Sequence, residues 1–206
     1  MNQIVRKNYV IGIETRKNLF ILAQSIGNGT VVFFNCFGKN PDEFKDIDLE
    51  KLEILSCITT ANLFFKKCNL MKLKIKPRLD LVDYNKTEHL AFGFTEWKKY
   101  VIYKKTVDEM EIEIRCGDLR LVNWKFETIK NLDINKDKNI IKKYVLNTMG
   151  VYGELNERLY LSYVFGKFVE SIKELIIGAK IPLEYKTYYE IIMQKITKNE
   201  WEKLVI

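Results

Sequence analysis

Histidine and paired cysteines are what this 206-residue chain most lacks. His89 is its single histidine, and its four cysteines, Cys36, Cys57, Cys68 and Cys116, are widely spaced with no C-x-x-C pair. A structural zinc site needs four His or Cys ligands, usually in closely spaced pairs. The sequence therefore excludes such a site and predicts no metal and no cofactor. It indicates free thiols that serve as small buried hydrophobic residues.

Long apolar runs are missing as well. A typical one, Val31–Phe34, stops at Asn35, whereas a membrane-spanning helix needs about 20 mostly apolar residues. The N-terminal stretch carries Arg6, Lys7 and Glu14, and Glu14 interrupts the apolar core that a signal peptide would need. We therefore expect a cytoplasmic protein that does not contact membranes.

The sequence motifs of common enzyme classes are also absent. There is no G-x-x-x-x-G-K-[ST] phosphate loop, no G-x-G-x-x-G after a strand and no G-x-S-x-G nucleophile motif. A Ser-His or Cys-His pair would have to use His89, which lies in a polar turn. These absences favour a protein that is not an enzyme.

One metal-dependent activity stays open as an alternative. A divalent-metal nuclease needs clustered carboxylates and a lysine near the attacking water. Asp83 with Glu96-Trp97-Lys98 fits that pattern loosely. Because Glu-x-Lys also occurs at residues 43–45 and 184–186, the pattern has little specificity in this chain.

Hydrophobic residues make up 47% of the chain and charged residues 30%, which excludes disordered and fibrous proteins. Short apolar segments occupy residues 9–13, 19–23 and 30–34, and Gly27-Asn28-Gly29 forms a tight hairpin turn before the third. They predict a curled antiparallel sheet or small barrel at the N-terminus.

Apolar residues recur at helical spacing in the last third of the chain. The pattern predicts helices over residues 139–149, 155–177, 187–196 and 198–205. Strands followed by helices are typical of an α+β fold. We expect a single domain over residues 1–206, in which a sheet-rich lobe, 1–137, is tightly joined to a helical lobe, 138–206.

Two charged segments are candidate partner-binding surfaces. The first is an acidic loop, whose candidate residues are Asp42, Glu43, Asp46, Asp48 and Glu50. The second is a lysine stripe, whose candidate residues are Lys72, Lys74 and Lys76. These lysines alternate with apolar residues, so a strand would place all three on one face.

A later segment mirrors the lysine stripe. Glutamates alternate with apolar residues in Glu109–Ile114. We prefer the interpretation that the two segments are neighbouring strands, in which each cross-strand charge pair would contribute roughly 0.2–1 kcal/mol. The alternative is that the lysine stripe is a binding surface.

Three strand patterns in the first third carry a family resemblance. They are Val10-Ile11-Gly12-Ile13, Phe20-Ile21-Leu22-Ala23-Gln24 and Val32-Phe33-Phe34-Asn35. A leucine-rich acidic segment, 49–55, and a Thr-Ala segment, 60–64, follow them. The order resembles a group of immunity proteins from bacterial polymorphic toxin systems. That family often has Asp where Asn35 stands, and its members are often acidic, whereas this chain has a net charge of +7.

The resemblance implies a stoichiometric inhibitor that binds the toxic domain of a cognate effector and blocks its active site. A basic, nuclease-like toxin would suit the acidic loop, and an acidic partner would suit the lysine stripe; we prefer the first. Nucleic-acid binding is the alternative, since Phe64 and Phe65 precede the lysine-rich stretch and Trp97 and Tyr100 flank Lys98-Lys99.

Overall fold

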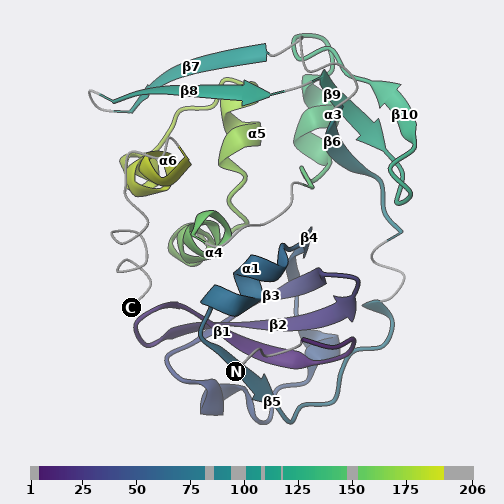
Figure 1. Cartoon of the computed structure of the whole chain (residues 1–206), viewed down its shortest axis with the longest axis vertical. Coiled ribbons are helices and arrows are strands. Elements are labelled where there is room, and N and C mark those ends of the chain that lie inside the picture. The colour runs from purple at the N-terminus through teal and green to yellow at the C-terminus, as the bar shows by residue number, and fades with distance from the viewer. Residues whose placement is uncertain are drawn as a thin grey trace. The chain divides into compact units, whose positions relative to one another are not determined.

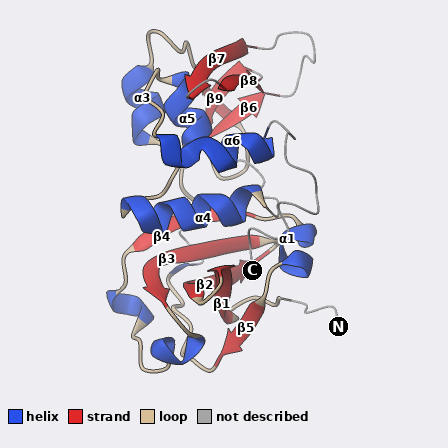
Figure 2. Ribbon diagram, turned by 90° about the vertical axis from the view of Figure 1, so that its left-hand side faces the viewer, coloured by secondary structure: helices blue, strands red, loops and turns tan. Residues whose placement is uncertain are grey.

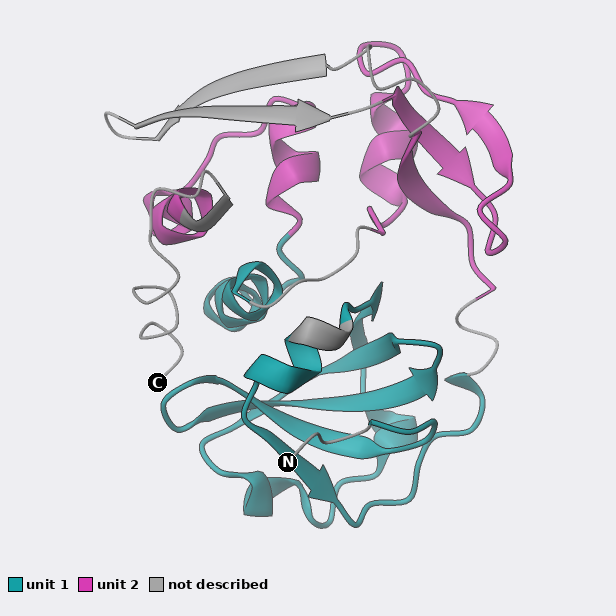
Figure 3. Ribbon diagram, viewed as in Figure 1, with its two compact units in different colours: residues 1–84, 149–169, 196–206 teal, residues 85–148, 170–195 magenta. Residues whose placement is uncertain are grey.

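The computed structural model describes residues 5–81, 86–93, 101–107, 110–116, 118–147 and 153–192. The chain forms two compact units, shown in Figure 3. The first comprises residues 1–84, 149–169 and 196–206, and the second comprises residues 85–148 and 170–195. The chain passes from the first unit to the second and back again. The boundaries of the two units therefore differ from those of the two lobes expected from the sequence, 1–137 and 138–206.

A five-stranded antiparallel sheet forms the first unit (Figure 1). Its strands, in spatial order, are β4 (Ile54–Thr59), β3 (Thr30–Gly38), β2 (Leu19–Gly27), β1 (Val10–Arg16) and β5 (Leu70–Leu73). Asn18 and Asn28 stand in the hairpin turns at positive φ, 59° and 52°, a conformation that Asn tolerates better than most residues. The expected N-terminal antiparallel sheet is confirmed. Among the described strands it stays open, with β4 and β5 at its edges, rather than closing into a barrel.

Both faces of this sheet are buried. On one face, side chains of β1, β2 and β3 pack with Phe64 of α1 (Asn62–Lys67) and with Leu155 and Leu159 of α4 (Glu154–Phe165). On the other face, the alternate side chains pack with Phe44, Leu49 and other loop residues. Figure 2 shows α4 along one side of the sheet and the short 3-10 turns on the opposite side. The strands therefore read as nearly continuous apolar runs because neither face meets water.

The expected long helix over residues 155–177 is wrong. α4 ends at Phe165, and Gly166 follows it in the left-handed conformation, with φ at 65°. Glycine at this position commonly terminates a helix. A separate helix, α5 (Ser171–Ile176), follows and belongs to the second unit.

The second unit contains two small sheets and short helices. One sheet has the order β10 (Thr128–Asn131), β9 (Asp118–Val122), β6 (His89–Gly93), and the other pairs β7 (Val101–Val107) with β8 (Met110–Cys116). The helical elements are α3 (Lys138–Lys143), α5, the 3-10 turn η3 (Leu183–Tyr185) and α6 (Lys186–Ile192). The α+β prediction is confirmed. The helix expected over 139–149 is shorter than predicted, and the one expected over 198–205 lies outside the described residues.

A buried ion pair ties α5 to the preceding loop within the second unit. Lys173 and Glu170 contact each other with side chains that are only 10% and 12% exposed. Lys173 Nζ donates to the Tyr144 carbonyl at 3.1 Å, and the Leu146 backbone N–H donates to Glu170 Oε1 at 2.8 Å. These backbone bonds satisfy both buried charges, which such a pair requires to be tolerated.

The expected pairing of lysine and glutamate strands is wrong. β5 pairs with β1 in the first unit, whereas the glutamates lie on β8, which pairs with β7 in the second unit. In that register Glu113 stands opposite Lys104. The glutamate strand therefore pairs within a local hairpin of the second unit and not with β5.

The thiols of the first unit are free, as predicted. Cys36, Cys57 and Cys68 are partly buried and form no disulfide. Burial raises the pKa of the Cys57 thiol to about 12 and also raises the pKa values of Cys36 and Cys68. Such thiols hold too little thiolate at neutral pH to act as nucleophiles.

Candidate functional site

The acidic loop is fixed onto the sheet rather than loosely attached. It contains two 3-10 turns, η1 (Pro41–Phe44) and η2 (Leu49–Lys51). Phe44 and Leu49 are buried in the core on that face of the sheet. The side chain of Asn40 caps η1 by accepting from the Asp42 N–H at 3.0 Å, and Asp48 caps η2 by accepting from the Glu50 N–H at 3.1 Å. Capping and apolar anchors together give the loop one defined conformation.

The glycine of β1 explains how closely this loop approaches the sheet. A Cβ atom on Gly12 would lie 3.8 Å from both Phe44 and Pro41 and 3.9 Å from Leu73. The start of the acidic loop and the end of β5 therefore converge over the one position of β1 that has no side chain. Glycine within a strand often marks such a close approach.

All five candidate acids of the loop are exposed: Asp42, Glu43, Asp46, Asp48 and Glu50. Residues 42–53 hold six carboxylates and two lysines, a net charge of −4. Two of the carboxylates pair with those lysines, Asp42 with Lys45 at 3.0 Å and Asp48 with Lys51 at 3.6 Å. Exposed pairs of this kind contribute only about 0–1 kcal/mol each, so a partner's charges can compete for them.

The other acids of the loop differ in whether their carboxylates make hydrogen bonds or ion pairs. Glu43 accepts hydrogen bonds from the Asn40 side chain at 2.9 Å and from the Lys39 N–H at 3.2 Å. Asp46 and Glu50 make no side-chain hydrogen bond or ion pair with any residue that the structure describes. These two carboxylates are the ones that a partner could engage without breaking an existing contact.

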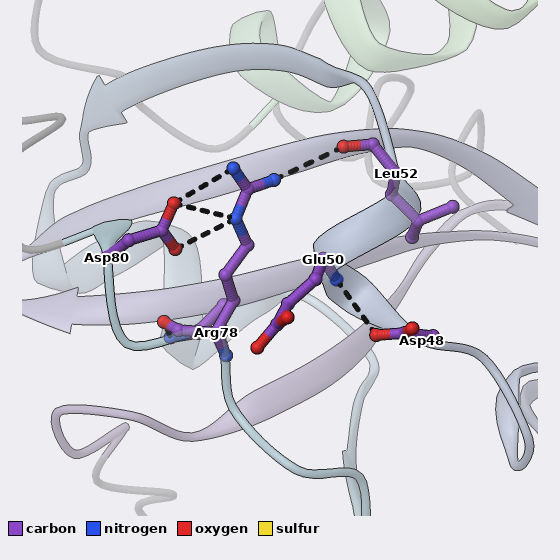
Figure 4. Close-up of polar contacts among 6 residues, drawn as sticks. Asp48, Glu50, Leu52, Arg78 and Asp80 are labelled. Atoms are coloured by element: carbon purple, nitrogen blue, oxygen red, sulfur yellow. Dashed lines mark hydrogen bonds and ion pairs between the residues drawn. The ribbon is translucent and has the colours of Figure 1, made fainter.

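Arg78 extends the acidic surface from a distant part of the sequence (Figure 4). Its guanidinium donates to both Asp80 oxygens, at 2.9–3.2 Å, and to the Leu52 carbonyl at 3.3 Å. Asp80 is 65% exposed, and its hydrogen bonds with Arg78 lower the pKa of its carboxyl group. Leu79, between them, is 62% exposed. An exposed apolar side chain beside charged groups is a common composition for a protein interface.

The backbone at Arg78 is hydrogen-bonded to the side-chain amide of a buried glutamine. Gln24 of β2 is fully buried, and its side chain donates to the Arg78 carbonyl and accepts from the Arg78 N–H, both at 2.9 Å. Sequence reasoning missed Gln24, Arg78, Leu79 and Asp80 as parts of this surface. Because 54 residues separate Gln24 from Arg78, no local pattern could have indicated the contact.

The three lysines do not form the predicted stripe on one strand. β5 ends at Leu73, so only Lys72 lies within it. The Lys72 ammonium lies 3.7 Å from the centre of the Tyr9 ring. Lys74 and Lys76 are exposed beyond the strand, while Leu73 and Ile75 pack against the core. Since β5 is an edge strand, these lysines also discourage pairing with another chain.

Within the described residues, no group of three or more His, Cys, Asp or Glu side chains could hold a metal ion. Asp83, Glu96 and Lys98, the loose nuclease pattern, lie outside the described residues. None of the described helices has both the length and the apolar character needed to cross a bilayer.

Comparison with known proteins gives one match. A family model described as Domain of unknown function (DUF8309) matches residues 1–179. The match covers the whole sheet of the first unit together with α4. No curated protein and no solved structure matches the chain.

Proposed function

The chain belongs to the family described as Domain of unknown function (DUF8309), and we propose that it is a cytoplasmic immunity protein. In this proposal it binds the toxic domain of a cognate bacterial effector one to one and blocks its active site. It performs no bond-making itself. The acidic surface, defined as residues 42–53 together with Arg78, Leu79 and Asp80, is the part that meets the toxin.

The observation that carries the proposal is the fixed conformation of an exposed surface with concentrated negative charge. Phe44, Leu49 and Gln24 hold its two segments against the sheet. A surface that is already in its bound shape loses little conformational entropy on binding. Opposite charge on the partner speeds the encounter and suppresses wrong partners.

A basic partner is therefore favoured over an acidic one. The acidic surface presents Asp46 and Glu50 without a described partner, whereas Lys72 is already engaged with Tyr9. A nuclease-like toxin is a suitable partner because an enzyme that binds nucleic acid carries a basic active-site face. An acidic surface docked there would exclude the substrate by charge and by volume.

Co-expression tests this proposal. We expect an adjacent gene to encode the toxic domain. That domain should arrest growth when it is expressed alone, and the wild-type chain should restore growth and co-purify with it one to one. Asp46→Lys with Glu50→Lys should abolish most of the rescue, because both positions would then repel a basic face. Asp46 and Glu50 are chosen over Asp48 and Asp42. Asp48 caps η2 and Asp42 pairs with Lys45, so replacing Asp48 or Asp42 would also disturb the loop.

The matched control reverses two exposed acids of the second unit, Glu88→Lys with Asp118→Lys. It changes the net charge by the same amount and should leave the rescue intact. Equal rescue by the two double variants would contradict the assignment of the surface. Failure of the wild-type chain to rescue growth or to bind the toxic domain would contradict the proposed function itself.

A further inference from the structure

The single histidine of the chain is buried in the second unit with one ring nitrogen unsatisfied. His89 begins β6, opposite Val122 of β9, and is 9% exposed. Its Nδ1 lies 3.4 Å from the Thr87 carbonyl. Its Nε2 is buried, and no described group hydrogen-bonds with it. A buried neutral imidazole can leave one nitrogen unpaired, but an imidazolium has two N–H donors and needs an acceptor for each.

The ring that covers His89 comes from a strained turn. Phe126 packs against the imidazole with ring centroids 4.9 Å apart and planes at 79°. Its φ is 64°, in the left-handed region that aromatic side chains rarely occupy, and its side chain is 60% exposed. Residues held in this region persist only where their surroundings impose it, and they cluster at clamps and switches.

Two backbone hydrogen bonds form the turn, from the Asn123 N–H to the Glu127 carbonyl at 3.0 Å and from the Phe126 N–H to the Asn123 carbonyl at 2.9 Å. The Asn123 side chain reinforces it. Asn123 Oδ1 accepts from the Lys125 N–H at 2.9 Å and from the Glu127 N–H at 3.0 Å. Asn123 Nδ2 donates to the Glu127 carboxylate at 2.6 Å. The turn between β9 and β10 thus holds Phe126 over His89 through a small set of exposed hydrogen bonds, which can open locally without unfolding the sheet.

We propose that His89 and Phe126 form a pH-sensitive latch that opens the Asn123–Glu127 turn when His89 is protonated. A proton on Nε2 places a positive charge where no described acceptor lies, so the charged form favours a conformation that admits water. That conformation moves Phe126 away and relieves its left-handed backbone. The latch goes beyond the proposed function, since it concerns the second unit and not the acidic surface.

Burial of His89, and not the mixed charges near it, sets the direction in which pH acts on the latch. On the strand side, Lys86 and Glu88 precede His89, and the partner position on β9 is the apolar Val122. On the turn side lie Lys125 and Glu127, and Glu127 is held by Asn123. Burial lowers the pKa of His89, and its hydrogen bond with Thr87 opposes this only in part. The closed latch is therefore fully favoured above the ordinary histidine pKa of about 6.5 and weakens as the pH falls below it.

Nuclear magnetic resonance of the full chain tests the latch, because a lone histidine gives an unambiguous side-chain signal. Between pH 8 and pH 5 we expect the imidazole to titrate with a midpoint below about 6.5, and the amide signals of residues 124–127 to shift with the same midpoint. A midpoint at the ordinary value, or turn amides that do not follow the imidazole, would overturn the proposal.

Two variants separate the latch from general acid unfolding. Phe126→Gly removes the ring and suits the left-handed φ, so the His89 midpoint should rise toward about 6.5. Trp124→Ala removes the neighbouring exposed ring and should leave that midpoint unchanged. If Phe126→Gly and Trp124→Ala behave alike, the ring does not control the imidazole. His89→Gln should abolish the common titration of the turn amides.

Discussion

Arg16→Met is expected to lower the free energy of unfolding by about 3–5 kcal/mol, the usual cost of removing one partner of a buried ion pair. The Arg16 guanidinium pairs with Glu157 on α4, whose side chain is only 4% exposed, and stacks on the Tyr160 ring at 4.1 Å. Methionine is shorter than arginine but retains an unbranched apolar stem, and it provides no charge. The Glu157 carboxylate would then stay buried without its cation.

Urea unfolding of the variant and of two controls measures this effect. Arg16→Met with Glu157→Leu removes both charges and should recover most of the lost stability, because an apolar pair can replace a buried ion pair at little cost. Lys51→Met breaks a pair whose lysine is 84% exposed and should change the stability by no more than about 1 kcal/mol. A loss for Arg16→Met as small as that for Lys51→Met would show that the pair is not buried as described.

Gln24→Leu is expected to lower the free energy of unfolding by about 2–6 kcal/mol. Leucine has nearly the volume of glutamine, but it leaves the Arg78 N–H and carbonyl without their partner, and each unsatisfied buried group costs about 1–3 kcal/mol. The backbone around Arg78 should detach from β2. Since Arg78 positions Asp80, the variant should also weaken the proposed binding to a toxic domain although it changes no charge.

Hydrogen exchange locates the effect of Gln24→Leu. The Arg78 amide donates to Gln24 in the native chain and should exchange much faster in the variant, while the amides of β1 and β2 stay protected. Asn35→Leu is the matched control, because Asn35 on the neighbouring strand is exposed and its side-chain amide donates to the Glu53 carboxylate at 3.3 Å. Unchanged exchange at Arg78 in the Gln24 variant would contradict the role given to the buried amide.

The first three strands of the first unit, β1, β2 and β3, were predictable because their residues follow local rules. Apolar strands, the Gly27-Asn28-Gly29 turn and the glycine within β1 each act over a few residues. The exposure of the acidic loop was predictable for the same reason, since charged side chains seldom lie buried without partners. What the sequence did not reveal was that Phe44 and Leu49 anchor this loop, because two apolar residues in a polar segment carry no periodic signal.

The wrong predictions share a physical cause, which is that long-range pairing leaves little trace in local sequence. Alternating lysines and alternating glutamates are compatible as neighbours, but β8 pairs with β7 in a local hairpin and β5 pairs with β1, which lies about 60 residues earlier in the chain. The helix expected over 155–177 followed an apolar period that continues through Gly166. The left-handed backbone of Gly166 ends α4, although the apolar periodicity of the sequence continues past it.

The association rate constant between this chain and the toxic domain that we propose as its partner tests the central claim most directly. At low ionic strength, Asp46→Lys with Glu50→Lys should slow association by about 10- to 100-fold, and the difference should shrink as salt screens the charges. The Glu88→Lys and Asp118→Lys control should associate at close to the wild-type rate. A rate that is unchanged by the acidic-surface variant, or that is insensitive to salt, would contradict the account.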